Sequence, residues 1–346
     1  MPLVAHTGLP TYKRLLSEGR QILSPERALT QEIRELHIGF LNMMPDAALE
    51  ATERQFFRLV NESSRVAQIY IHPFTLPELK RGKKATAHID QYYERFEKIK
   101  EDGLDALIVT GANVTNPNLA DEAFWKPLQG VLEWARAHVT STLCSCLATH
   151  AVMEFQYGQR RQPLPEKKWG VYEHRVVDRT HPVVRGMNTR FHVPHSRWNA
   201  ITPEQFKKAG MKILIRSEEA GVHMATSKDG FRLICFQGHP EYDIMSLLKE
   251  YKREILLHLE GKRSNYPPFP AHYFSKDVKE IATNFRKNPA GEFPEKEITK
   301  LLDNTWSDSA RSCVGNWIGL VYQTTHVARK KLFMDGIDPE NPLESL

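Results

Sequence analysis

One stretch of the sequence, residues 139–150, constrains the fold more than any other. It begins as a β-branched run, which favours a strand, and changes after Cys146 into residues 147–157, whose apolar side chains recur at helical spacing. A strand that turns abruptly into a helix places its last side chain at the edge of a sheet, where the N–H groups of the first helical turn face the same point. The pattern therefore predicts a strand, a sharp turn with a cysteine, and a helix.

A cysteine at such a turn is a candidate nucleophile. The positive end of the helix dipole favours a thiolate, and unpaired N–H groups can bind an oxyanion. Cys146 fits this position, whereas the alternation of the strand places Cys144 inside it. The alternative is that both cysteines are small buried apolar residues.

A second candidate group, His239-Pro240-Glu241, follows the predicted strand 231–236. Residues two apart on an extended segment point to one side, so the imidazole and the carboxylate can meet. Cys146, His239 and Glu241 would then act as nucleophile, base and orienting carboxylate. Alone, the histidine would be read as a surface residue in a turn; together with the cysteine it indicates a catalytic site.

The order of elements predicts an α/β fold with a doubly wound, mostly parallel sheet of the flavodoxin-like type. Strands are expected at 36–42, 66–71, 106–109 and 139–145, with helices at 47–61 and 124–137 and a helix or irregular segment at 88–100. Such sheets bind ligands at the carboxyl ends of their strands, where the Thr110-Gly111 loop and Cys146 are expected.

The second half of the chain predicts additional short strands and a helical C-terminal segment. Strands are expected at 171–177, 190–193, 213–216, 222–225 and 231–236, and helices at 244–256 and 309–331, with one modest helix within 260–308. We expect an N-terminal extension (1–34), an α/β catalytic domain (35–260) and a C-terminal helical extension (261–346) that packs on the same domain.

Composition excludes several classes of function. The net charge of +5 comes from dispersed basic residues, and the densest cluster, residues 80–84, has no aromatic platform beside it, so we expect no nucleic-acid partner. No apolar stretch is long enough to cross a membrane and residues 1–20 lack a signal-peptide core, so a cytoplasmic location is expected. Four irregularly spaced cysteines fit neither a disulfide scaffold nor a zinc site, and we expect no metal.

The Cys146 turn and the sequence Phe236-Gln237-Gly238-His239-Pro240-Glu241 resemble the class I glutamine amidotransferase fold, although no glycines flank the cysteine. A closer resemblance is to the homoserine O-acyltransferases of methionine biosynthesis, of the O-succinyltransferase type. The matching segments are residues 41–45, 107–112, 139–143, 170–174, 194–197, 238–243 and 316–323.

The resemblance implies a two-step acyl transfer, the first committed step of methionine biosynthesis. Cys146 would attack succinyl-CoA, and the acyl-cysteine would pass its succinyl group to the side-chain hydroxyl of L-homoserine. His239 would act as base, oriented by Glu241, with no cofactor beyond the co-substrate. Serine or another small hydroxy amino acid is an alternative acceptor. Resemblance also implies a homodimer.

The resemblance further places Lys167, Ser196 and Arg253 in substrate binding. A guanidinium suits an amino-acid carboxylate. The alternative for Arg253 is a surface ion pair with Glu250, one helical turn before it.

Two positions differ from the family pattern. Relatives often have a lysine shortly after the Met-Pro pair, where this chain has Asp46, so we expect backbone N–H groups to bind the oxyanion. At the position that selects the acyl donor, succinyl users commonly have glycine and acetyl users glutamate; this chain has Thr115, which would not repel a succinyl carboxylate. The alternatives are an acetyltransferase, a Cys-His-Glu glutamine amidohydrolase and a catalytically silent binding protein.

Overall fold

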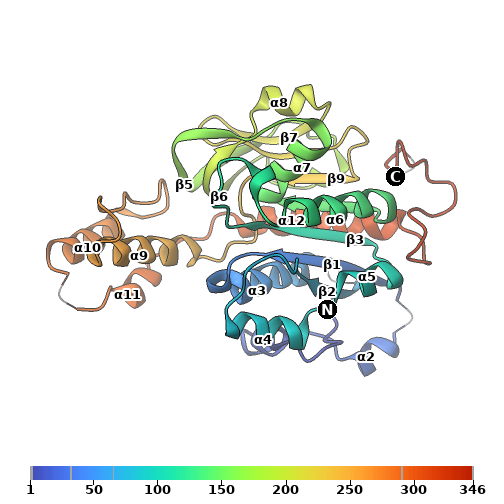
Figure 1. The fold of residues 1–346 in the computed structure, drawn as a ribbon, viewed down its shortest axis with the longest axis horizontal. Coiled ribbons are helices and arrows are strands. Elements are labelled where there is room, and N and C mark those ends of the chain that lie inside the picture. The colour runs from blue at the N-terminus through green and yellow to red at the C-terminus, as the bar shows by residue number, and fades with distance from the viewer. Residues whose placement is uncertain (1–2, 32, 65, 290, 345–346) are drawn as a thin grey trace.

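The computed structural model describes residues 3–31, 33–64, 66–289 and 291–344. Within these ranges, nine strands form one sheet in the spatial order β2-β1-β3-β4-β9-β8-β7-β5-β6. Helices pack on both faces of this sheet, and α9, α10 and α11 extend from one end of the molecule (Figure 1). We call these three helices the helical arm. The termini of the predicted extensions, residues 1–2 and 345–346, lie outside the described residues.

One half of the sheet is parallel and carries the predicted doubly wound topology. Its strands are β2 (Gln68–Phe74), β1 (Glu35–Met43), β3 (Ala106–Ala112), β4 (Ser141–Ser145) and β9 (Leu233–Phe236). The chain first adds β2 on one side of β1 and then β3 and β4 on the other, so the winding direction reverses between β1 and β3. The prediction of a doubly wound sheet is confirmed, and its ligand-binding edge lies beside this reversal.

The other half of the sheet is antiparallel and consists of β8 (Gly221–Thr226), β7 (Lys212–Ser217), β5 (Gln162–Val176) and β6 (Arg190–Ala200). Sequence analysis predicted only the second part of β5 and the first part of β6. The missed part of β5 contains two prolines and three charged residues, so it lacks a strand's apolar alternation. Because the strands are longer than predicted, Lys167 lies on β5 and Ser196 on β6, and these two strands pair with each other.

Two helical layers cover the sheet. On one face, α1 (Pro10–Ser17), α3 (Asp46–Ser63) and α12 (Ser307–Thr324) share an apolar core with the strands. On the other face, α5 (Phe96–Asp102), α6 (Trp125–His138), α7 (Leu147–Tyr157) and α8 (Pro203–Lys208) share a second core. The predicted helix at 147–157 is confirmed.

Other helix predictions need correction. The segment 88–100 is part of two helices, α4 (Lys83–Tyr92) and α5, because Tyr93 is extended and the next N–H, from Glu94, donates to Pro73 O. The last helix was predicted to reach residue 331 but ends at Thr324, since Thr325 is extended and bridges to Phe333. The remaining short helices are α2 (Pro25–Leu29), η1 (Leu119–Asp121) and η2 (Pro182–Val184).

The helical arm has its own apolar core. It comprises α9 (Ser246–Leu259), α10 (Lys276–Lys287) and α11 (Glu295–Thr299), which pack around Tyr251 together with Trp169 and Val171 of β5. Residues 260–308 therefore contain two helices where the sequence predicted one. No helix among the described residues is both long and apolar enough to cross a membrane.

Candidate active site

Cys146 occupies a strained turn between β4 and α7. Its backbone angles, φ of 51° and ψ of −108°, lie in a region that residues other than glycine rarely adopt. Among the described non-glycine residues, only His272 also has a positive φ. The turn is held to β9, because Cys146 N–H donates to Phe236 O at 2.8 Å and Thr149 Oγ1 donates to the same carbonyl at 2.8 Å. Neighbouring structure thus maintains the strain and presents the thiol at the edge of the sheet.

The two cysteines of this stretch differ in environment as the sequence predicted. Cys144 is fully buried in β4, and burial raises the pKa of its thiol well above the ordinary value. Cys146 is partly exposed. Cys144 is therefore an inert core residue, whereas Cys146 is accessible to a substrate.

His239 and Glu241 form a buried pair at the end of β9, the strand beside β4. Their Nδ1 and Oε1 atoms are 2.7 Å apart. Burial by itself lowers the pKa of His239, but the charges of Glu241 and Cys146 and hydrogen bonds with both raise it well above its ordinary value. Glu241 thus holds Nδ1 and leaves Nε2 for Cys146. The structure brings together the three residues that the sequence predicted as catalytic.

Several contacts fix the imidazole of His239. Its backbone N–H donates to Pro194 O at 2.8 Å, and its ring stacks on Tyr242 with 4.3 Å between centroids. Behind it lie three buried histidines, and burial lowers the pKa of His174 to about 4 and those of His195 and His223 well below the ordinary value. These neighbours are therefore neutral at pH 7 and do not compete with His239 for its proton.

Glu250 joins the predicted substrate-binding residues to this histidine. Lys167 Nζ lies 3.2 Å from its Oε2, Ser196 Oγ donates to Oε2 at 2.7 Å, and Tyr242 OH donates to Oε1 at 2.8 Å. Burial raises the pKa of Glu250, but the charge of Lys167 and these hydrogen bonds outweigh it and lower the pKa. The helical spacing of Glu250 indicates only an ion pair with Arg253, because spacing along a helix does not show that Glu250 points toward β5 and β6.

Arg253 lies apart from this group. Its side chain is 61% exposed on α9, and its guanidinium contacts Glu254 at 3.2 Å. It forms neither the surface pair with Glu250 that the sequence allowed nor a contact with Lys167 or Ser196 among the described interactions.

Thr115 lies in the loop that follows β3. The N–H groups of Thr115 and Asn116 both donate to Glu122 Oε1 at 2.7 Å, and Arg161 donates to the carbonyl oxygens of Asn116 and Pro117 at 3.0 Å. Burial lowers the pKa of Arg161, while the charges of Glu154, Glu122 and Cys146 act against this. A half-buried cation that the sequence pattern does not reveal thus contacts the Thr115 loop, and the charge of Cys146 acts on it.

The segment after β1 forms a wall of the site. A Cβ placed on Gly111 would lie 3.6 Å from Met44 Sδ and 3.7 Å from Cys146 Cβ, so the methionine side chain lies beside the nucleophile. Gly111 lies beside both side chains and beside the N–H of Leu147, 3.9 Å from the position of such a Cβ.

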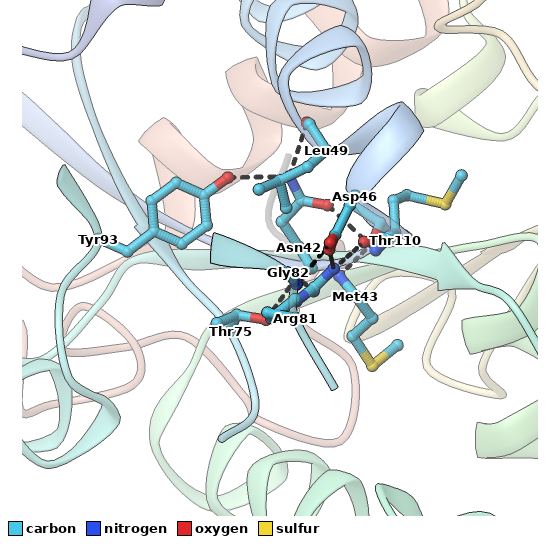
Figure 2. Close-up of polar contacts among 10 residues, drawn as sticks. Asn42, Met43, Asp46, Leu49, Thr75, Arg81, Gly82, Tyr93 and Thr110 are labelled. Atoms are coloured by element: carbon cyan, nitrogen blue, oxygen red, sulfur yellow. Dashed lines mark hydrogen bonds and ion pairs between the residues drawn. The ribbon is translucent and has the colours of Figure 1, made fainter. Parts of the chain in front are cut away.

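Arg81 holds this segment in place, as Figure 2 shows. Its guanidinium donates to Met44 O, to Asn42 O at 3.4 Å and to Thr75 Oγ1 at 3.2 Å, and it pairs with Asp46 at 3.4 Å. Asp46, the residue after the Met-Pro pair, therefore anchors the loop through Arg81 and through the N–H of Gly82, which donates to its Oδ2 at 2.7 Å.

A strained cysteine beside a buried His–Glu pair, at the carboxyl edge of a doubly wound sheet, is the arrangement that cysteine-dependent transferases and hydrolases use. The sequence matches the model of one such family, "HTS: Homoserine O-succinyltransferase", over residues 2–327. The chain belongs to the homoserine O-succinyltransferase family of acyltransferases.

Curated relatives over the full length of the chain support this assignment. The chain is 61% identical to homoserine O-succinyltransferase of Thiobacillus denitrificans, over 99% of both chains, and 59% identical to that of Allochromatium vinosum, again over 99% of both. Similar solved structures include a glutamine amidotransferase from Thermotoga maritima (TM-score 0.48, 9% identity, 84% of this chain and 99% of that one) and one from Methylobacillus flagellatus (TM-score 0.46, 14% identity, 83% and 95%).

Proposed function

We propose that this chain transfers the succinyl group of succinyl-CoA to the side-chain hydroxyl of L-homoserine in methionine biosynthesis, through an acyl-cysteine intermediate. The observation that carries the mechanism is the contact of Cys146 with the buried His239–Glu241 pair at the carboxyl ends of β4 and β9. Membership of the homoserine O-succinyltransferase family supports the choice of reaction.

In the first step, the Cys146 thiolate attacks the thioester carbonyl and forms a tetrahedral intermediate. The backbone N–H of Leu147 is suited to bind the oxyanion, because Leu147 is the first residue of α7 and its N–H has no intrahelical acceptor. The N–H of Cys146 itself is engaged by Phe236 O. The intermediate collapses, the C–S bond to CoA breaks, and the imidazolium of His239 protonates the leaving thiolate.

In the second step, His239 accepts the proton of the homoserine hydroxyl, whose oxygen attacks the acyl-cysteine. Collapse of this second tetrahedral intermediate breaks the bond to Cys146 Sγ and releases O-succinylhomoserine. Lys167 and Ser196 bind the acceptor beside His239, since Glu250 holds both and also holds Tyr242, on which the imidazole stacks. The Glu250 carboxylate offers an ion pair to the ammonium group of the amino acid.

Arg253 has to leave Glu254 to reach this pocket. Because its side chain is exposed on α9, a rotamer change toward the acceptor carboxylate requires no core rearrangement. Its role in substrate binding stays a prediction.

The donor is chosen at the Thr115 loop. Thr115 carries no charge, and the guanidinium of Arg161 behind it attracts the free carboxylate of a succinyl group. Acetyl-CoA has no such carboxylate and gains nothing from Arg161. Position 115 and Arg161 together therefore favour succinyl-CoA.

The mass of the intact protein after brief exposure to each acyl-CoA, without acceptor, tests this function. Wild type should gain one succinyl group from succinyl-CoA and lose it when homoserine is added, and Cys146→Ala should gain none. An adduct from acetyl-CoA and none from succinyl-CoA would keep the acyl-cysteine mechanism but show that the donor is acetyl-CoA. No adduct with either donor, together with ammonia release from glutamine, would replace the proposal with an amidohydrolase.

A further inference from the structure

A cluster of histidine and carboxylate side chains lies on the edge of the sheet away from Cys146. His72 is on β2, which β1 and β3 separate from β4. His6 comes from the N-terminal segment, which runs beside β2 through the bridge of Leu3 to Ile69. Glu94 lies between α4 and α5. The cluster therefore joins three segments that are far apart in the sequence.

The donor atoms of the cluster are close together. One atom each from His6, His72 and Glu94 lie within 4.8 Å of one another, and His72 Nδ1 is 2.6 Å from Glu94 Oε1. Two nitrogens and a carboxylate oxygen bound to tetrahedral zinc at ~2.0–2.1 Å are about 3.3 Å apart. A metal ion thus requires only small side-chain movements, with the ion replacing the proton between His72 and Glu94.

One ring nitrogen of His6 has no hydrogen-bond partner in the part of the chain that the structure describes. His6 Nδ1 lies 3.1 Å from Val4 O, and because a carbonyl only accepts, the proton of the neutral ring is on Nδ1. Nε2 then carries the lone pair, and it is buried without a hydrogen-bond partner among the described residues. A buried acceptor without a donor is costly, and a metal ion would satisfy it.

The ring of His72, the second histidine of the cluster, is also held in an orientation that suits metal binding. His72 Nε2 lies 2.8 Å from His37 Nδ1, and His37 Nε2 lies 3.2 Å from Glu35 Oε2. With a metal on Nδ1, His72 donates from Nε2 to His37, which donates in turn to Glu35. Such outer hydrogen bonds to carboxylates and carbonyl oxygens fix the orientation of metal-binding histidines.

We propose that His6 Nε2, His72 Nδ1 and the Glu94 carboxylate bind one divalent transition metal ion, with Zn²⁺ as the best match to two imidazoles and a carboxylate. The ion fastens the N-terminal segment to β2 and to the connection between α4 and α5. Its role is structural, because two strands, β1 and β3, lie between the site and the nucleophile strand. The expectation of no metal rested on the cysteines, and the histidine ligands are too widely separated in sequence to form a recognisable motif.

Metal titration of the full, untagged chain tests the site. All variants carry Cys146→Ala, because Cys146 and His239 could themselves bind zinc. Co²⁺ is followed by its visible absorption, and Zn²⁺ by competition with a chromogenic chelator. The host protein should bind one equivalent, and His6→Gln should weaken the affinity at least about tenfold. His138→Gln, at an exposed histidine on α6, is the matched control and should bind as the host does.

Thermal unfolding gives a second readout that separates ligation from folding. Because His6→Gln also removes the contact of Nδ1 with Val4 O, the unfolding temperature of each protein without metal serves as its own baseline. Added Zn²⁺ should raise the unfolding temperature of the host and of His138→Gln, but not that of His6→Gln. Equal Zn²⁺ affinity and equal temperature shifts in host and His6→Gln, or no bound metal in the host, would overturn the proposal.

Discussion

At the scale of single residues, the proposed mechanism depends on the positive charge that Glu241 stabilises on His239. The raised pKa of His239 keeps the imidazolium available at neutral pH, where it pairs with Glu241 and faces Cys146. Unfolding returns the histidine to a pKa near 6.5. The folded protein therefore holds a proton that the unfolded chain gives up above that pH, and this difference links the site to stability.

Glu241→Gln tests this link. Removing the charge should lower the pKa of His239 and destabilise the protein by about 1.5–3 kcal/mol below pH 6.5, the range for hydrogen bonds to charged groups. The difference in unfolding free energy between wild type and variant should shrink as the pH rises through the folded pKa of His239, because wild type then loses the imidazolium. Urea unfolding across pH measures this. A difference that grows with pH would contradict the assignment.

Arg161→Gln tests the choice of donor. Loss of the guanidinium should raise the KM for succinyl-CoA by about 10- to 100-fold, in line with a hydrogen bond to a charged group, and leave acetyl-CoA little affected. Thr115→Glu should also reduce the preference for succinyl-CoA over acetyl-CoA, because the new carboxylate repels the succinyl carboxylate. Steady-state kinetics with both donors measure the ratio.

The matched control for Arg161 is Arg160→Gln, whose side chain is 74% exposed and pairs with Glu154. It should leave both KM values unchanged. A Thr115→Glu enzyme that kept its preference for succinyl-CoA would refute the role of this loop.

At the scale of elements, the sequence predicted the centre of the site better than its surroundings. The β4–Cys146–α7 turn and the pair at the end of β9 each depend on a few adjacent residues, so local patterns revealed them. Lys167 and Ser196 could be placed only by resemblance, because the parts of β5 and β6 that carry them have no apolar alternation. Glu250, Arg161 and Arg81 were missed, because their roles depend on contacts across the fold.

The segment after β1 shows how such a distant contact can matter for catalysis. Arg81, whose side chain is only 8% exposed, binds the carbonyl oxygen of Asn42 near the end of β1, that of Met44 just after it, and the Asp46 carboxylate. Arg81→Gln should release Met44 from its place beside Cys146 and reduce the rate of acylation by about tenfold to a hundredfold, the cost of a small misplacement of a reacting group.

Single-turnover acylation, measured by quenched mass spectrometry, tests this effect of Arg81. Lys83→Gln, an exposed residue two positions on, should acylate at the wild-type rate. An Arg81→Gln protein with a wild-type acylation rate would show that the anchored loop is irrelevant to the chemistry.

At the scale of the whole molecule, both predicted extensions contact the α/β body. Thr11 of α1 donates to the buried carboxylate of Glu53 on α3, which also accepts from Tyr93 at 3.0 Å. From the other end of the chain, Trp317 of α12 donates to Ser141 Oγ of β4 at 2.9 Å. The three-part division of the chain and the homodimer stay predictions. A dimer would have to use another surface than the apolar face of α12, which packs within the chain.

The contact of α12 with α3 is close enough to test with a single methyl group. A Cβ on Gly315 would lie 2.5 Å from Ser63 O at the end of α3, whereas a Cβ on Gly319, four residues later on the same helix, would meet nothing within 4 Å. Gly315→Ala should therefore force the helices apart and destabilise the protein by about 1–3 kcal/mol, as overpacking does. Gly319→Ala should instead stabilise it by about 0.5–1 kcal/mol, since alanine favours a helix. Urea unfolding measures both changes in the free energy of unfolding, and the two changes must have opposite signs. If both variants were stabilised, α12 would not rest on α3 at this point. The C-terminal helix would then not be fixed to the body as the packing indicates.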